Sequence, residues 1–170
     1  MHNSSSIENP VILLKGVNKW YGDFQALKDI NLEIKLKEKI VICGPSGSGK
    51  STLIRCLNRL EAHQEGLIEV CGIELHERMH DVDIIRQDIG MVFQNHQLLF
   101  DRTVFDNVAL PLLISGYSRK DAGRRVRAAL DKVGLLNKEN LLPIMLSGGE
   151  QQRIGIARAV VNKPPILLAD

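Results

Sequence analysis

Short apolar runs alternate along the chain with stretches in which apolar residues recur every three or four positions. Residues 30–34 read Ile-Asn-Leu-Glu-Ile, the two-residue period of a half-buried strand. Residues 40–42 read Ile-Val-Ile, a continuous run typical of a buried strand that leads straight into a glycine-rich loop. The pattern predicts strands over residues 11–17, 30–34, 39–43, 67–70, 89–93 and 166–169.

Helical periodicity fills most of the intervening segments. It predicts helices over residues 51–60, 103–114, 121–133 and 149–161. The apolar face of the first of these helices consists of Leu53, Ile54, Leu57 and Leu60. Ser118 precedes the third helix and is a suitable N-cap, because its hydroxyl can accept a hydrogen bond from the first helical turn.

Strands that alternate with helices predict an α/β fold with a largely parallel sheet and a β-rich N-terminal portion. The middle of the chain, residues 94–148, is mainly helical in pattern and is expected to form a separate helical lobe. The final run of apolar residues, 166–169, ends at Asp170.

Composition narrows the class of protein. The chain has 170 residues, of which 44% are hydrophobic and 25% charged, and its net charge is +2, values typical of a globular domain without the dense basic face of a nucleic-acid binder. The scattered cysteines, Cys43, Cys56 and Cys71, indicate reduced thiols rather than a disulfide framework or a zinc site.

Hydropathy predicts no direct membrane insertion. The sequence has no run of the roughly 20 apolar residues that a membrane span needs, and residues 1–10 lack the apolar core of a secretory signal. We therefore expect a cytoplasmic protein, linked to a membrane only through a partner.

One loop carries a specific chemical signal. It fits the pattern G-x-x-x-x-G-K-[ST] between a predicted strand and a predicted helix, and it consists of Gly44, Pro45, Ser46, Gly47, Ser48, Gly49, Lys50 and Ser51. Its glycines let backbone N–H groups converge on phosphate oxygens, and the helix N-terminus adds partial positive charge. The pattern predicts that Lys50 contacts the β- and γ-phosphates of ATP, that Ser51 ligates Mg²⁺, and that Thr52 adds a nucleotide contact.

Two further features point to the same chemistry. Asp170 ends an apolar strand, where a second Mg²⁺-organising carboxylate belongs in a protein with such a loop. Ser147, Gly148, Gly149 and Glu150 open a second predicted helix that is suited to an anion, which a one-site enzyme does not need.

Residues 146–153, Leu-Ser-Gly-Gly-Glu-Gln-Gln-Arg, resemble the signature motif of ATP-binding-cassette (ABC) ATPases. With the phosphate loop and the strand ending at Asp170, the resemblance covers nearly the whole chain. It implies a head-to-tail homodimer in which one subunit's loop 44–51 and the other subunit's residues 147–149 hold ATP between them. It also implies an integral membrane ABC subunit as partner, at the inner face of the bacterial plasma membrane.

The same resemblance assigns two more residues. Tyr21 is similar to the aromatic residue that stacks on adenine, and Gln94 is similar to the glutamine that touches Mg²⁺ or the attacking water. The catalytic set is thus Lys50, Gln94 and Asp170, and the metal set is Ser51, Gln94 and Asp170. The implied organisation is one nucleotide-binding domain over 1–170, with an ATP-binding core at 1–93, a helical lobe at 94–148, and a signature helix and strand at 149–170.

The two halves resemble different members of the family. Residues 19–34 and 43–75 resemble the ATPases of polar amino-acid importers, whereas residues from 89 onward resemble the ATPase of the bacterial cell-division ABC complex, with a seam near 86–94. The second half faces the membrane partner in this family, which favours cell division slightly over amino-acid import.

Other classes remain as alternatives. A DNA-repair or chromosome-structure ATPase needs a long insertion between Lys50 and Ser147, for which there is no room, and a P-loop kinase or GTPase leaves residues 146–153 unexplained. A non-catalytic ATP-binding fragment is the third alternative. The carboxylate that polarises water and the switch histidine are expected beyond Asp170, so we expect the chain to be C-terminally truncated and weak or inactive in hydrolysis.

Overall fold

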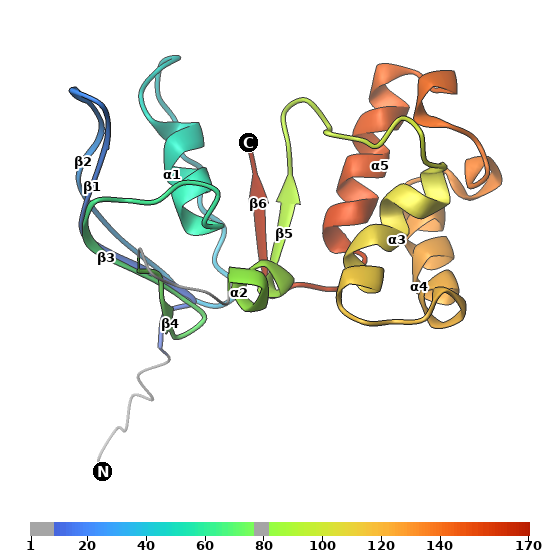
Figure 1. Cartoon of the computed structure of the whole chain (residues 1–170), viewed down its shortest axis with the longest axis horizontal. Helices are drawn as coiled ribbons and strands as arrows, with labels where there is room; N and C mark the ends of the chain where they lie inside the picture. The colour runs from blue at the N-terminus through green and yellow to red at the C-terminus, as the bar shows by residue number, and fades with distance from the viewer. Residues whose placement is uncertain (1–8, 77–81) are drawn as a thin grey trace, which may run out of the picture. The chain divides into compact units, whose positions relative to one another are not determined.

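The computed structural model describes residues 9–76 and 82–170, and the chain divides into two compact units, residues 1–85 and 86–170. Each unit is described by itself (Figure 1). Most of the segment in which we expected no secretory signal, residues 1–8, lies outside the described residues.

The first unit is built on a four-stranded antiparallel sheet of order β2-β1-β3-β4. The strands are β1 (Ile12–Tyr21), β2 (Phe24–Ile34), β3 (Glu65–Val70) and β4 (Ile73–Glu74). A tight turn joins β1 to β2, since Tyr21 pairs with Phe24 and Ile12 with Ile34. This sheet is the expected β-rich N-terminal portion, and its buried side chains include Leu14, Val17, Ile68 and Val70.

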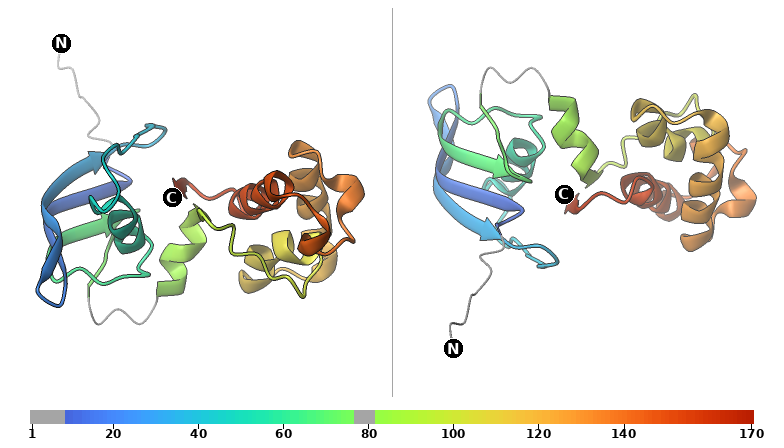
Figure 2. Two further views of the ribbon diagram at one scale, coloured as in Figure 1. Left: turned by 90° about the horizontal axis from the view of Figure 1, so that it is seen from above. Right: turned by 90° about the horizontal axis from the view of Figure 1, so that it is seen from below.

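Helix α1 (Lys50–Leu57) lies beside this sheet and buries Leu53, Ile54, Cys56 and Leu57 (Figure 2). The predicted helix 51–60 was too long at its C-terminal end. Arg59 takes a positive φ of 58°, and Leu60, expected on the buried face, is 49% exposed. Helix α1 ends at Leu57, and the left-handed backbone at Arg59 prevents the helix from continuing, so Leu60 does not extend the buried face of Leu53 and Leu57.

The predicted buried strand over residues 39–43 is wrong. Residues 38–44 form neither helix nor strand, and Val41 is 84% exposed, with Ile40 and Ile42 at 42% and 40%. A strand exists only through hydrogen bonds to a neighbour, and no described strand pairs with this segment. Apolar composition indicates a segment that is suited to a sheet interior, but it cannot supply the neighbouring strand.

The second unit combines a parallel pair of strands with a helical core. Strand β5 (Ile89–Val92) follows helix α2 (Val82–Asp88), which crosses the boundary between the units, and pairs in parallel with β6 (Ile166–Ala169). Helices α3 (Val104–Ile114), α4 (Arg119–Lys132) and α5 (Gly148–Val160) pack together, with short 3₁₀ turns η1 (Leu136–Lys138) and η2 (Pro143–Met145) between α4 and α5.

The second unit's core consists of fully or nearly fully buried residues, among them Val104, Val108, Leu112, Val126, Leu130 and Ile154. Gly90 brings β5 onto α5, because a Cβ at that position would lie 2.3 Å from the carbonyl oxygen of Ala159. The expected helices 103–114, 121–133 and 149–161 therefore exist with ends shifted by one or two residues, and Ser118 caps α4 by accepting from the Asp121 N–H. The α/β fold class is confirmed, with β5–β6 as its parallel part.

None of the helices in residues 9–76 and 82–170 has the length and apolar character that crossing a bilayer requires.

Candidate functional site

The phosphate loop folds around its own lysine. The ammonium of Lys50 donates to the carbonyl oxygens of Gly44 and Pro45, over 2.8 and 2.7 Å, and lies 3.4 Å from the Ser48 hydroxyl. The Ser48 N–H closes the loop by donating to the Pro45 carbonyl over 3.3 Å. The loop therefore holds a cation at its centre, with its backbone wrapped around that charge.

Helix α1 begins in a way that leaves its N-terminus open to an anion. Its N-cap is Gly49, whose φ of 90° is left-handed, and which provides no side chain to accept from the first N–H groups. A Cβ at Gly49 would lie 2.6 Å from the Ala26 carbonyl oxygen, so a larger residue cannot replace it. The first turn carries no acidic residue, and the partial positive charge of the helix end adds to that of Lys50.

Ser51 and Thr52 follow in the first turn of α1 and are half-buried, whereas residues 44–48 are exposed. Tyr21 lies at the end of β1 and is 42% exposed. The Lys19 ammonium sits 4.7 Å from the centre of that ring, a cation–π arrangement that fixes the ring's orientation.

In the second unit, the signature segment starts α5 with a capping box. Ser147 is the N-cap; its hydroxyl accepts from the Glu150 N–H, while its own N–H donates to Glu150 Oε2 over 2.9 Å. Lys138, in η1, forms an ion pair with Glu150 Oε1. The Lys138 ammonium first, and then the Ser147 N–H and hydroxyl, lower the pKa of Glu150 to about 2. The carboxylate is therefore fixed and ionised at neutral pH.

The two glycines between Ser147 and Glu150 have no reason within their own unit to be glycine. A Cβ at Gly148 or Gly149 would meet no described atom of that unit within 4 Å, and neither residue has a positive φ. Both are exposed at the start of α5. Their small size thus leaves room for something outside the unit to approach the first N–H groups of the helix.

The strand pair β5–β6 brings Gln94 and Asp170 to one edge. The strands run parallel with Val92 opposite Ala169, so the chain leaves both strands at the same end. Gln94 follows β5 in an exposed turn that the His96 N–H closes by donating to the Phe93 carbonyl over 3.1 Å. Asp170, directly after β6, donates its own N–H to the Val92 carbonyl.

The predicted residues thus gather in three places. The loop 44–51 continues into Thr52 in the first unit, which also contains Tyr21 at the end of β1, while the Gln94–Asp170 edge and residues 147–150 belong to the second unit. The oxygen donors expected for Mg²⁺ are a hydroxyl, an amide and one carboxylate, at Ser51, Gln94 and Asp170. This set fits Mg²⁺, which prefers oxygen and takes only one or two protein carboxylates when phosphates supply the rest.

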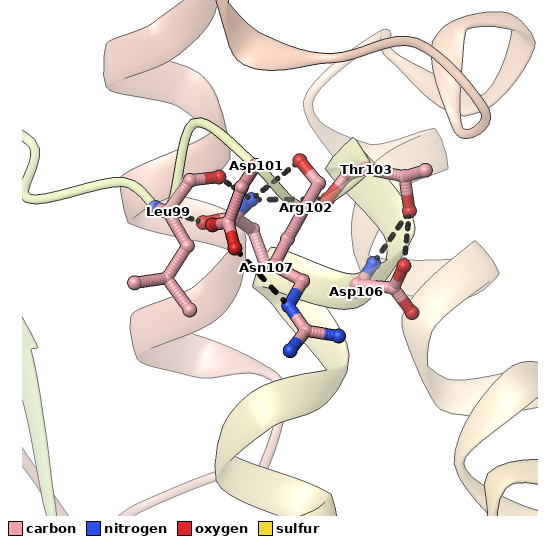
Figure 3. Close-up of polar contacts among 6 residues, drawn as sticks. All are labelled: Leu99, Asp101, Arg102, Thr103, Asp106 and Asn107. Atoms are coloured by element: carbon pink, nitrogen blue, oxygen red, sulfur yellow. Dashed lines mark hydrogen bonds and ion pairs between the residues drawn. The ribbon is translucent and has the colours of Figure 1, made fainter.

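Sequence reasoning missed the residues that support these groups. Asn107 is fully buried, and its side-chain amide accepts from the Leu99 N–H and donates to the carbonyls of Leu99, Arg102 and Thr103, which fixes the loop that follows the Gln94 turn (Figure 3). Thr103 caps α3 by accepting from the Asp106 N–H. The pattern Thr-x-x-Asp signals that cap, but no local pattern marks Asn107, because its partners are backbone groups of a loop.

The fold and the phosphate loop define a P-loop nucleotide-binding protein of the α/β class. A family model described as ABC transporter matches residues 27–170, so this chain belongs to the ABC transporter ATPase family.

Two curated relatives illustrate the family's range. The uncharacterized amino-acid ABC transporter ATP-binding protein YhdZ of Escherichia coli (strain K12) is 47% identical over 163 residues, which are 95% of this chain. The cell division ATP-binding protein FtsE of the same strain is 51% identical over 162 residues, or 94% of this chain. The chain spans 65% of the length of the first relative and 73% of the second.

Solved structures agree with this assignment. A dimeric ATP-binding cassette in a post-hydrolysis state, bound to ADP and Pi, matches with a TM-score of 0.86 at 40% identity, over 94% of this chain and 73% of that one. CbiO1 from Clostridium perfringens, part of an ABC transporter complex, matches with a TM-score of 0.82 at 29% identity, over 96% of this chain and 66% of that one.

Proposed function

We propose that this chain binds ATP with Mg²⁺ and couples that binding to a membrane partner. The observation that carries the proposal is that one chain contains two helix N-termini suited to an anion. One starts at Gly49 beside Lys50, and the other starts at Ser147 with two glycines that nothing in their own unit requires.

The roles follow from the chemistry of each group. Lys50 and the loop N–H groups bind the phosphates, with Thr52 beside them, and the Tyr21 ring takes the adenine face. Ser51, Gln94 and Asp170 are the metal's protein ligands, and Gln94 also contacts the attacking water. Residues 147–150 bind the nucleotide held by the loop of a second copy. A bound Mg²⁺ supplies charge neutralisation at the phosphates.

Dimerisation and hydrolysis are supported by the dimeric cassette that holds ADP and Pi. We propose that the family's reaction here is the conversion of ATP to ADP and phosphate. Asp170 is assigned to the metal, and no second carboxylate of the described residues is assigned to the water. We therefore expect the 170 residues by themselves to bind nucleotide and to turn over little of it.

We propose that the second unit contacts an integral membrane ABC subunit. The loop that Asn107 fixes exposes Leu99 and Phe100, which are 41% and 51% exposed, and Ile114 at the end of α3 is 66% exposed. Such a partner would hold the chain at the inner face of the bacterial plasma membrane. In this organisation, residues 1–93 form the ATP-binding core and residues 94–148 form the helical lobe. Residues 149–170 form the signature helix and the strand that ends at Asp170.

The pathway proposal favours the cell-division complex, supported by the 51% identity to FtsE and by the resemblance of the second half. Import of a polar amino acid is the second candidate, supported by the 47% identity to YhdZ. Measuring how the purified chain binds to reconstituted membrane subunits of the cell-division complex and of an amino-acid importer distinguishes the two proposals. Preferential binding to the importer subunit would make amino-acid import the favoured proposal.

Titration with a fluorescent ATP analogue in Mg²⁺ tests nucleotide binding. Lys50→Ala removes a charge-assisted phosphate contact worth about 1.5–3 kcal/mol, so its affinity should fall by about ten- to a hundredfold. Lys132→Ala, which removes an exposed lysine near the end of α4, is the matched control and should bind as the unaltered chain does. If Lys50→Ala and the control bound the ATP analogue with equal affinity, the proposed nucleotide site at Lys50 would be contradicted.

A further inference from the structure

The side chain of Arg158 ties helix α5 to the segment that follows Gln94. Its guanidinium donates from one nitrogen to the His96 carbonyl over 2.6 Å and from the other to the Gln97 carbonyl over 2.8 Å. More than sixty residues of chain separate Arg158 from these two carbonyls. The two bonds use the guanidinium as a fork, a geometry that fixes orientation as well as distance.

The segment held in this way has an unusual backbone. His96 and Gln97 both have positive φ, 56° and 43°, although neither is glycine. Two consecutive left-handed residues persist only where surrounding contacts impose them. Arg158 supplies such contacts, and burial lowers the pKa of its guanidinium, as expected for a charge whose hydration the two carbonyls replace.

Gln94 depends on this segment for its position. The turn containing Gln94 is closed by the His96 N–H, while the carbonyl of the same residue accepts from Arg158. The peptide groups on either side of His96 are thus fixed, one to the turn and one to α5. Ser147 caps the N-terminus of α5 and Arg158 lies near its other end, so one helix connects residues 147–150 to the Gln94 turn.

We propose that Arg158 is the positioning residue for Gln94. It holds the turn by tying the His96 and Gln97 carbonyls to α5, so that Gln94 keeps a fixed place at the end of β5. The proposal rests on the proposed role of Gln94 as a metal ligand. It predicts that loss of Arg158 weakens the metal-dependent part of ATP binding while the phosphate loop, in the other unit, keeps its own affinity.

The test compares Arg158→Ala, Gln94→Ala and the double variant, with Arg124→Ala on the exposed face of α4 as a matched arginine control. The measured quantity is the ratio of ATP affinity in Mg²⁺ to ATP affinity in EDTA. Each single change should lower the ratio by a similar factor, and the double variant should lower it no further, because both act on one group. The affinity in EDTA should stay unchanged in all variants.

Amide hydrogen exchange over residues 94–98 provides a readout that does not depend on metal. Arg158→Ala should speed this exchange by about tenfold or more, since the left-handed segment loses its anchor. Arg158→Lys should give an intermediate value, because one ammonium cannot reproduce the fork. If Arg158→Ala does not fold, Arg158→Lys is used in its place for both measurements.

The possible outcomes separate the two ideas. If Gln94→Ala leaves the Mg²⁺ ratio unchanged, the proposed ligand role of Gln94 fails, and the exchange measurement alone decides whether Arg158 holds the turn. If Gln94→Ala lowers the ratio but Arg158→Ala does not, or if the losses multiply in the double variant, the positioning role of Arg158 is overturned. Unchanged exchange in Arg158→Ala also overturns it.

Discussion

Asp170 donates its backbone N–H to the carbonyl oxygen of Val92 over 3.1 Å. This bond extends the parallel pairing of β5 and β6 by one residue beyond Ala169. It places the carboxylate of Asp170 at the edge where the chain turns toward Gln94, although most of the second unit lies between them in sequence. Two residues with the oxygen-bearing side chains that Mg²⁺ prefers therefore follow the same end of one strand pair.

The loop after Gln94 should depend on a single buried amide. Asn107→Ala removes the acceptor of the Leu99 N–H and the donor to three carbonyls, and it leaves these buried backbone groups unpaired. We expect a loss of about 1–3 kcal/mol in the free energy of unfolding, measured by urea denaturation. Asn140→Ala, at an exposed asparagine of the same unit, is the control and should cost much less. Equal costs would show that the Asn107 contacts contribute nothing net.

The sequence predicted most elements because their signals are local. The Ser118 cap, the alternation in 30–34 and the phosphate loop are each determined within a few residues, and all lie where expected. The apolar run 40–42 failed as a strand, because a strand also needs a neighbour, which periodicity does not show.

The residues that support the site could not be predicted from the sequence, because their roles also depend on neighbours that are distant along the chain. The sequence does not distinguish Arg158 and Lys138 from other surface charges, and only the fold shows their contacts with His96 and Glu150. The change of resemblance near residues 86–94, by contrast, starts at the boundary between the two compact units, which lies after Ile85.

Cysteine reactivity should report on the phosphate loop. Cys56 is fully buried, and burial raises its pKa to about 11, whereas Cys43 is exposed and directly precedes Gly44. Since the thiolate is the reactive form, iodoacetamide at pH 8 should label Cys43 in the native chain and Cys56 only after denaturation. ATP with Mg²⁺ should slow labelling of Cys43. Mass spectrometry of the labelled peptides identifies which cysteine has reacted and how fast. Labelling of Cys43 and Cys56 at the same rate would contradict the burial of Cys56.

The signature turn should lose stability in acid. The pKa of Glu150 is lowered from 4.5 to about 2 in the folded chain, chiefly by Lys138. A group whose pKa is lower when folded contributes its full stability above its unfolded pKa and loses it as the pH falls toward the folded value. The contribution should therefore be complete above about pH 4.5 and be lost between there and about pH 2.

Glu150→Gln tests this assignment, since the amide keeps an acceptor for the Ser147 N–H but cannot form the ion pair. The variant should be less stable than the unaltered chain at pH 6, and the difference should shrink as the pH approaches 2, as measured by denaturation at several pH values. A difference that stays constant over this range would assign the stabilisation to the hydrogen bonds alone. Added salt should reduce the difference, because the Lys138 side chain is 34% exposed and salt screens an ion pair that solvent can reach.

The glycines of the signature turn should separate stability from function. A Cβ at Gly148 meets no described atom of its unit within 4 Å and requires no unfavourable φ, so Gly148→Ala should leave the fold intact. Because alanine loses less backbone entropy than glycine in a helix, the variant should be as stable as the unaltered chain or more stable by up to about 0.5–1 kcal/mol.

The same variant tests whether the start of α5 receives a nucleotide. If the first N–H groups of α5 receive the nucleotide of a second copy, the methyl group added by Gly148→Ala obstructs the approach of that nucleotide. ATP-dependent dimerisation, measured by analytical ultracentrifugation on a form of the protein that dimerises in ATP, should then fall sharply in the Gly148→Ala variant. The thermal stability of the variant should stay unchanged. Gly90→Ala is the opposite control, since its Cβ would lie 2.3 Å from the Ala159 carbonyl oxygen and should destabilise the unit. Unimpaired association of a stable Gly148→Ala protein would mean that the open start of α5 is not an interface for nucleotide.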